Sequence, residues 1–212
     1  MKALIIGATG ATGKDLVEVL LKDPHYTEVV AFVRRPSGRA HPKYSEVITD
    51  FEKLENVASL IRGDVWFSCL GTTRKTAGSK AKHWHIDYDL PAKFAEIARR
   101  NGVVRAVLLS AYGASSTSRV FYSKLKGTLD DHIAALGFEP CIIFRPGFLI
   151  RENTDRPSEL MIAKALKILN GLGLLKKFRP LPTSTLAEKL AKAPQVFTYG
   201  THIIELDDVF HV

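Results

Sequence analysis

The stretch Met1-Lys2-Ala3-Leu4-Ile5-Ile6-Gly7-Ala8-Thr9-Gly10-Ala11-Thr12-Gly13 decides the fold. Its apolar run ends in glycine, and residues 14–21 then repeat Leu and Val at helical spacing. This order predicts a strand, a tight turn and a helix. The spacing G-x-x-G-x-x-G is typical of a dinucleotide-binding turn, in which glycines let the backbone approach a pyrophosphate at a helix N-terminus. Three glycines elsewhere would be an ordinary loop, but their position here favours a nucleotide site.

Apolar runs and amphipathic segments alternate along the rest of the chain. We expect strands at residues 29–33, 47–48, 65–70, 103–109 and 141–145, and helices at 51–62, 84–100 and 120–136. Parallel strands that are buried on both faces have continuous apolar sequences of this kind. The sequence therefore predicts an α/β fold, a Rossmann-type doubly wound parallel sheet with right-handed crossovers.

The pattern is less regular after Pro146. We expect a helix from residue 157 that ends before 171, a basic and apolar connector at 172–182, a helix at 185–192 and a strand at 202–206. Residues 1–212 are predicted to form one NAD(P)-binding domain, within which 147–195 form a small C-terminal substrate lobe. The two glycines and the leucines of 171–175 favour a hinged lid at 172–178, whose lysines attract an anionic substrate or surface.

Composition limits the classes of partner. The chain has 212 residues, 46% hydrophobic and 25% charged, as expected of a soluble domain. No run reaches the length of a transmembrane helix, although the segment 160–178 leaves peripheral membrane contact open. The net charge of +8 is spread without a basic tail, so we expect a small-molecule substrate and no nucleic acid, and a protein partner stays open. Cys69 and Cys141 lie in apolar runs, which favours buried, reduced thiols and a cytoplasmic location.

Two arginines, Arg34 and Arg35, follow the second predicted strand. Enzymes that prefer NAD usually carry an acidic residue there for the ribose hydroxyls, whereas a guanidinium suits a 2′-phosphate. The alternative is a pair of surface arginines in a loop. The pattern favours NADP(H) as the cofactor, with NAD(H) less favoured.

Ser110, Tyr122 and Lys126 form a candidate catalytic set. Ser110 ends the fifth predicted strand, and Tyr122 and Lys126 lie four residues apart on one face of the next helix. A Tyr-x-x-x-Lys pair alone is usually a packing pair. Its position after a serine-terminated strand favours acid/base chemistry, because a nearby cation can make a tyrosine a better proton donor and acceptor near neutral pH.

These motifs resemble the short-chain dehydrogenase/reductase superfamily in its atypical branch. Within that branch, residues 69–74, 109–110, 144–147 and 156–159 look like the subgroup typified by the HIV Tat-interacting protein, small NADPH-binding and oxidoreductase-like. The resemblance implies that Ser110 polarises a substrate carbonyl, Tyr122 exchanges the proton, and Lys126 holds the cofactor ribose. It further implies cofactor contacts from Gly7, Thr9, Gly10, Ala11, Thr12, Gly13, Asp50, Phe51, Leu70, Gly71, Thr72 and Pro146, with Asp50 and Phe51 near adenine.

Asp87 departs from the family pattern, because many of these enzymes have an asparagine there that anchors a proton-relay water. A carboxylate could hold the same water or cap the helix. His83 and His85 have a spacing that occurs in metal sites, but no further ligand completes a shell, so we interpret them as surface histidines and expect no metal.

The sequence thus predicts an NADP(H)-dependent oxidoreductase that acts on a small carbonyl or alcohol substrate. The alternative is an NADPH-binding, redox-sensing regulatory protein with little or no turnover.

Overall fold

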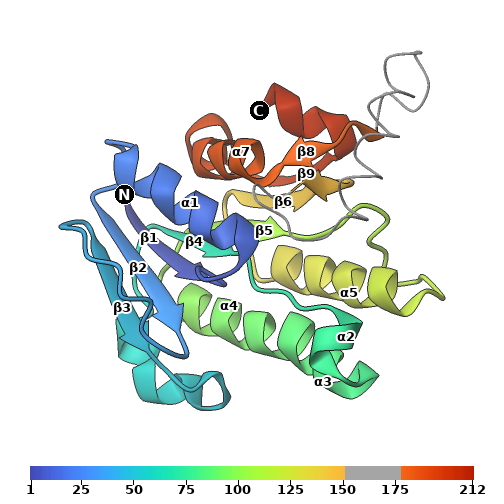
Figure 1. The fold of residues 1–212 in the computed structure, drawn as a ribbon, viewed down its shortest axis with the longest axis horizontal. Coiled ribbons are helices and arrows are strands. Elements are labelled where there is room, and N and C mark those ends of the chain that lie inside the picture. Colours follow the sequence, from blue (N-terminus) through green and yellow to red (C-terminus); the bar gives the residue numbers. More distant parts are fainter. Residues whose placement is uncertain (151–177) are drawn as a thin grey trace.

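Seven parallel strands form the centre of the protein in the computed structural model, which describes residues 1–150 and 178–212 (Figure 1). The strands lie in the order β3-β2-β1-β4-β5-β6-β9. Their bounds are Lys2–Ile6 (β1), Glu28–Val33 (β2), Tyr44–Ile48 (β3), Val65–Ser68 (β4), Arg105–Leu109 (β5), Cys141–Arg145 (β6) and Thr201–Glu205 (β9). The predicted doubly wound parallel sheet is confirmed. Because β1 pairs with both β2 and β4, the strand order reverses there, and ligands of such sheets bind at this switch point.

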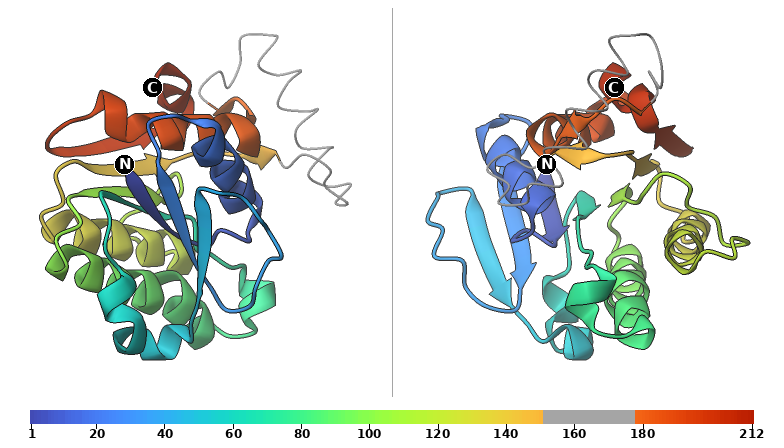
Figure 2. Two further views of the ribbon diagram at one scale, coloured as in Figure 1. Left: turned by 90° about the vertical axis from the view of Figure 1, so that its left-hand side faces the viewer. Right: turned by 45° about the vertical axis from the view of Figure 1, so that its right-hand side comes forward.

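Helices cover both faces of the sheet (Figures 1 and 2). One layer contains α1 and α7, which pack against each other, and the other contains η1, α4 and α5. The helical bounds are Ala11–Lys22 (α1), Phe51–Leu60 (η1), Arg74–Ala77 (α2), Lys80–Trp84 (α3), His85–Asp89 (η2), Leu90–Arg100 (α4), Phe121–Ala135 (α5), Thr183–Val196 (α7) and Leu206–His211 (η4).

Alternate residues of β1 supply the two halves of the core. Ala3 and Ile5 pack with α1 and α7, whereas Leu4 and Ile6 pack with α4, and all four are fully buried. Burial of an Ile or Leu side chain stabilises the fold by about 2 kcal/mol. This arrangement explains why the strand sequence is continuously apolar rather than alternating.

Two predicted helices differ from the observed ones. The segment at 51–62 consists of 3-10 turns over Phe51–Leu60, interrupted by a kink at Lys53, whose φ of −124° and ψ of 41° are not helical. Asp50 caps its start by accepting from Glu52 N. The helix predicted at 84–100 begins at Lys80 and contains the π-helical turn η2. At the end of this turn the amide of Leu90 bonds to His85 O, five residues earlier. The next residue, Pro91, has no N–H to donate to the helix.

The C-terminal part adds a second, two-stranded sheet. Its strands are β7, Leu149–Ile150, and β8, Leu181–Pro182, and they pair in parallel. The helix predicted at 157–170 and nearly all of the predicted lid lie outside the described residues, so the division into a domain and a lobe stays a prediction. Within the described ranges, no helix is both long and apolar enough to span a bilayer.

Candidate cofactor and substrate site

The turn between β1 and α1 has room for glycine only. Gly7 has a φ of +80°, and a Cβ built on it would lie 2.4 Å from the carbonyl carbon of Cys69. A Cβ on Gly13 would lie 2.0 Å from Gly7 O. Both positions therefore require glycine, because the turn packs directly on the chain after β4 and on itself.

The N-terminus of α1 is open to an anion. No side chain of the described residues caps it at Gly10, and its first turn has no acidic residue. The amides of this turn can thus bind a phosphate, which the helix dipole also favours. The residues present fit the pyrophosphate of a dinucleotide.

A cavity of about 350 Å³ runs along this turn, and we call it the turn cavity. It lies at the carboxyl ends of β1, β4 and β6. Its lining residues are Gly10, Ala11, Thr12, Cys69, Gly71, Gly147, Phe148, Leu149 and Thr183. Four predicted cofactor residues therefore lie together there, and Pro146 is next to it in sequence, buried, with its carbonyl accepting from Tyr112 N at 3.0 Å.

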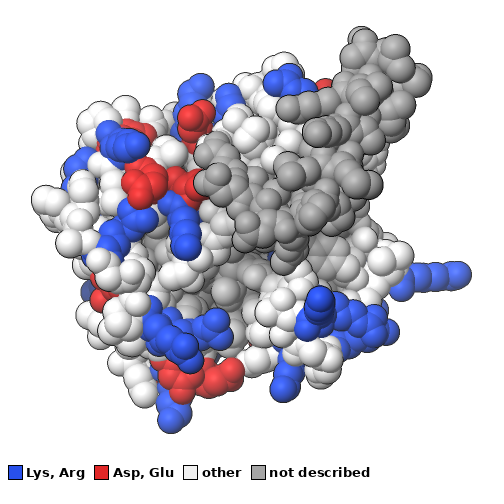
Figure 3. Space-filling view, viewed as in Figure 1, with Lys and Arg blue, Asp and Glu red and all other residues white. Residues whose placement is uncertain are grey.

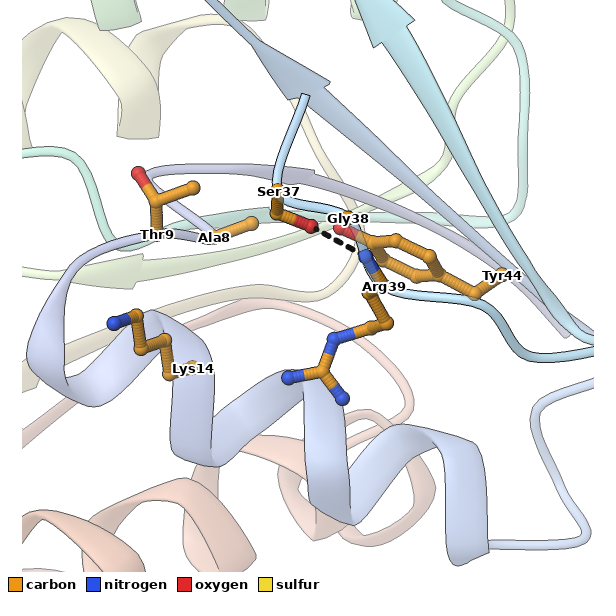
Figure 4. Close-up of a pocket in the computed structure, with 7 residues that line it drawn as sticks. All are labelled: Ala8, Thr9, Lys14, Ser37, Gly38, Arg39 and Tyr44. Atoms are coloured by element: carbon orange, nitrogen blue, oxygen red, sulfur yellow. Dashed lines mark hydrogen bonds between the residues drawn. The ribbon is translucent and has the colours of Figure 1, made fainter. Parts of the chain in front are cut away.

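A second cavity, of about 400 Å³, lies on the other side of the turn beside the loop after β2, and we call it the loop cavity. Figure 4 shows Lys14 on the first turn of α1 and Arg39 extending from the loop alongside that helix. Its lining residues are Ala8, Thr9, Lys14, Ser37, Gly38, Arg39 and Tyr44. Arg34 and Arg35 are exposed and do not line it. The sequence analysis missed Lys14, Ser37, Arg39 and Tyr44.

The carboxylate of Glu46 anchors this loop. It accepts from Ser37 N at 3.0 Å and from the Tyr44 hydroxyl at 2.7 Å, and the Ser37 hydroxyl also bonds to it. Burial and the bond to Glu46 raise the pKa of Tyr44 to about 12. Arg39 lies 5.7 Å from the centre of the Tyr44 ring and pairs with Glu18. The position of Arg39 therefore depends on contacts distant in sequence.

Asp50 and Phe51, predicted to lie near adenine, have structural contacts of their own. Asp50 is exposed and its side chain caps η1, whereas Phe51 is 8% exposed and packs into the α4 layer of the core. Neither lines the turn cavity or the loop cavity. Their contact with a cofactor stays a prediction.

The predicted catalytic residues lie at the ends of β5 and α5. Ser110 is 6% exposed, Lys126 4% and Tyr122 42%. The amide of Ser110 bonds to Phe144 O at 2.8 Å, which fixes its backbone at the sheet edge. Its hydroxyl is buried and lies near the carboxyl of Asp130, but it makes no hydrogen bond of normal geometry among the described residues.

Asp87 connects this set with the chain after β4. It is 1% exposed, Oδ1 accepts from Thr72 N at 2.7 Å, and Oδ2 lies 3.5 Å from Lys126 Nζ. A Cβ on Gly71 would lie 3.7 Å from Lys126 Nζ, so the lysine lies directly beside this lining residue of the turn cavity. Asp87 lies in the π turn η2, within a continuous helical segment, and therefore does not act as a helix cap. Such turns are frequent at functional sites.

A third cavity, of about 590 Å³, opens in front of Tyr122, and we call it the tyrosine cavity. Its lining residues are Thr72, Thr73, Arg74, Lys80, His83, Val120, Phe121 and Tyr122. The interpretation of His83 as a surface histidine was wrong: it is 3% exposed, and its Nε2 lies 3.6 Å from Asp87 Oδ2. His85 is partly exposed and bonds to Glu52 and Asp89 instead. The helical spacing of four between His83 and Asp87 was the signal that could have placed His83 at the site.

Two further contacts hold α5 in place. Arg145 Nε donates to Asp130 Oδ2 at 2.8 Å, and its Nη1 donates to Glu205 at 2.9 Å. Burial raises the pKa of Asp130, which Arg145 only partly offsets. One turn before Asp130 on α5, a Cβ on Gly127 would lie 2.2 Å from the carbonyl carbon of Ser115. The loop of residues 111–119 therefore rests directly on the helix, where Ser115 N also bonds to Ser123 O at 3.0 Å.

The family model described as NAD(P)H-binding matches residues 7–161, which include the turn, Asp87 and the Ser110, Tyr122 and Lys126 set. The chain belongs to this NAD(P)H-binding family. Protein HTATIP2 of Rattus norvegicus is 36% identical over 165 residues, which cover 76% of this chain and 68% of that protein. The mitochondrial protein FMP52 of Eremothecium gossypii is 35% identical over 154 residues, or 72% of this chain and 68% of that protein. The resemblance to the atypical short-chain branch is confirmed.

Solved structures agree with this assignment of the fold. MoeE5 in complex with UDP-glucose and NAD superposes with a TM-score of 0.73 at 16% identity, covering 99% of this chain and 79% of that one. At that identity, the likeness concerns the fold of the NAD(P)H-binding family and not the activity of this member.

The predicted cytoplasmic location was wrong, since several relatives carry the name FMP52, mitochondrial. The prediction rested on cysteine. Burial raises the pKa of the Cys141 thiol to about 12, as expected of an unreactive core residue. A buried thiol, however, is compatible with any compartment that keeps thiols reduced, so it does not distinguish the cytoplasm from a mitochondrion.

Proposed function

We propose that this protein is an NADP(H)-dependent oxidoreductase of the short-chain type that acts on a small carbonyl or alcohol substrate. One observation carries the proposal. On a single face of α5, Tyr122 opens to the tyrosine cavity while Lys126, four residues on, reaches Gly71 at the turn cavity. A proton donor on the substrate side and a cation on the nucleotide side are thereby adjacent.

Each residue of the site would have its own role. The turn of Gly7 to Gly13 and the N-terminus of α1 hold the pyrophosphate. The hydroxyl of Ser110 donates a hydrogen bond to the substrate oxygen, and the Tyr122 hydroxyl gives a proton to it or takes one from it. Lys126 binds the ribose hydroxyls. The bound nicotinamide supplies or accepts the hydride.

The preference for NADP(H) rests on the basic residues around the loop cavity. Lys14 and Arg39 line it, Arg34 and Arg35 begin the same loop, and no acidic side chain is among its described lining residues. A ribose 2′-phosphate carries up to two negative charges, which a guanidinium binds well and which a carboxylate would repel. The names of the FMP52 relatives support a mitochondrial location.

The second candidate function is an NADPH-binding regulatory protein with little turnover. The contact between Asp87 and Lys126 favours it, because a carboxylate 3.5 Å from Nζ offsets the positive charge that would assist proton transfer by Tyr122. Such a protein would bind NADPH and present the occupied site to a protein partner.

One experiment separates the two. The purified protein is mixed with NADPH and a panel of small aldehydes and ketones, and loss of NADPH absorbance is followed, with NADP and the matching alcohols in the reverse direction. Turnover that requires Tyr122 supports the oxidoreductase. Tight NADPH binding without turnover of any compound in either direction would support the regulatory protein instead.

A further inference from the structure

The tyrosine cavity has a charged rim and an apolar wall. Arg74 on α2 and Lys80 on α3 are its exposed cationic lining residues, and no acidic side chain is among the described residues that line it. Figure 3 shows Lys and Arg side chains gathered over the region of α2 and α3, without Asp or Glu among them on that face. Val120 and Phe121 at the start of α5 form an apolar wall, and Nζ of Lys80 lies 5.6 Å from the centre of the Phe121 ring.

His83 is a polar group in this cavity that lacks a hydrogen bond. Its side chain is buried, and neither ring nitrogen has a hydrogen-bond partner among the described residues. Its ring packs against both aromatic wall residues, with centroids 5.6 Å from Phe121 and 6.0 Å from Tyr122. Oδ2 of Asp87 lies 3.6 Å from Nε2, which is longer than a hydrogen bond, and a ligand in the cavity could supply a shorter one.

We propose that the tyrosine cavity selects carbonyl substrates that carry a carboxylate at the end remote from the carbonyl, joined by an apolar body. The inference rests on the proposed oxidoreductase function and names its class of substrate. The carbonyl lies at Tyr122, the apolar body packs on Phe121 and Val120, and the carboxylate pairs with Arg74 and Lys80. His83 donates a hydrogen bond to the carbonyl oxygen of the substrate, at the end that lies beside Tyr122. A guanidinium and an ammonium at one rim suit a carboxylate, because charge-assisted hydrogen bonds are stronger than neutral ones.

The test compares 4-carboxybenzaldehyde with its methyl ester. The two have similar shapes and differ in charge. The ionised carboxylate withdraws electrons less than the ester does, so the aldehyde of the ester is intrinsically the more reactive toward hydride, and a preference for the acid must come from binding in the cavity. In each reduction the aldehyde carbon receives a hydride from NADPH and its oxygen receives a proton, which gives the alcohol and NADP. We expect kcat/KM for the acid to exceed that for the ester by about 10-fold or more, the usual worth of a hydrogen bond to a charged group.

Matched variants assign the preference to this cavity. The Arg74→Ala/Lys80→Ala double variant should bring the ratio of acid to ester close to one, and His83→Phe should lower kcat/KM for both compounds. The control is Lys75→Ala/Lys82→Ala, which removes the same charge from exposed residues of α2 and α3 that do not line the cavity. The control should keep the ratio.

A binding arm keeps this inference separate from the proposed function. The alcohol product, 4-(hydroxymethyl)benzoate, and its methyl ester are titrated by calorimetry into the protein saturated with NADPH. If neither aldehyde is reduced but the acid binds tightly and loses affinity in Arg74→Ala/Lys80→Ala, the cavity assignment holds and the enzymatic proposal fails. Equal kinetics or equal binding of acid and ester, or a preference that persists in the double variant, would overturn the inference.

Discussion

The backbone N–H of Thr72 donates a 2.7 Å hydrogen bond to Oδ1 of Asp87, a carboxylate that also lies 3.5 Å from Lys126 Nζ. One side chain thus fixes the chain after β4 and the buried lysine of α5 at the same time. Asp87 lies in the π turn η2, four residues before Pro91.

Asp87→Ala should destabilise the protein by about 3 kcal/mol, because it leaves a buried lysine without its counter-charge and the Thr72 amide without an acceptor. Asp87→Asn keeps an oxygen at Oδ1 for Thr72 and should cost less. Urea unfolding of the two variants measures the difference. Equal losses would show that the hydrogen bond to Thr72 contributes nothing measurable.

Arg39→Ala should weaken binding of NADPH by about 10-fold or more and leave NADH affinity almost unchanged, since a charge-assisted bond to the 2′-phosphate is lost. Fluorescence titration of both cofactors measures it. The Arg34→Ala/Arg35→Ala variant is the matched comparison from the same loop. If the loss of NADPH affinity is larger in this double variant than in Arg39→Ala, then Arg34 and Arg35 bind the 2′-phosphate, as the sequence indicated.

Tyr122→Phe should lower kcat by about 10² to 10⁴, the usual contribution of a positioned acid or base, and leave NADPH affinity intact. Substrate turnover measures the expected fall in kcat, and cofactor titration of the same preparation measures the NADPH affinity. If kcat is unchanged, Tyr122 only lines the cavity and another group carries the proton.

His85 should stabilise the protein at low pH and lose that effect as pH rises. Hydrogen bonds to Glu52 and then to Asp89 raise its pKa. The contribution is therefore complete below the unfolded pKa of about 6.5 and disappears as pH rises through the higher folded value. The difference in unfolding free energy between wild type and His85→Gln should shrink as pH rises above about 6.5, from a maximum of less than about 1 kcal/mol, since the ring is partly exposed.

The control for this prediction is His41→Gln, since His41 Nδ1 bonds to the backbone amide of Lys43 and not to a carboxylate. Chemical denaturation at each pH gives both differences. A His85 effect that grows with pH would contradict the assignment.

Arg145→Leu should cost about 3 to 5 kcal/mol, because the buried carboxylate of Asp130 loses its counter-ion. Glu205→Gln, which removes the more exposed partner of the same arginine, should cost less than about 1 kcal/mol. Adding Asp130→Asn to Arg145→Leu should restore part of the loss. Denaturant unfolding of these variants measures the losses of unfolding free energy. Equal losses for Arg145→Leu and Glu205→Gln would argue against a buried ion pair between Arg145 and Asp130.

The sheet could be predicted because its strands are buried on both faces, so that each is a continuous apolar run. The turn of Gly7 and Gly13 was equally visible, since contacts at 2.0 to 2.4 Å allow no side chain there. Both features are local in sequence. The π turn before Pro91 is local as well, and a proline inside a predicted helix was the available signal for it.

The loop cavity could not be predicted in the same way. Arg39 lies there because Glu46 bonds to Ser37 and Tyr44, and because Glu18 of α1 pairs with the guanidinium. None of these contacts follows from spacing along the loop. The burial of His83 likewise depends on α5 packing over it, which only the tertiary structure brings about. The cofactor and catalytic roles of the predicted residues remain to be tested by the variants above.

The close contact between Gly127 and the loop of residues 111–119 limits how this protein can acquire a new specificity. Any larger side chain at Gly127 would push the loop off the helix, so the backbone of this loop must keep its present conformation. Directed evolution toward another substrate should therefore accumulate exchanges among the side chains of α2, α3 and the first turn of α5, and few insertions or deletions in the loop. A library randomised at Arg74, Lys80 and Val120 should yield more active variants than one of equal size in which the loop length is varied.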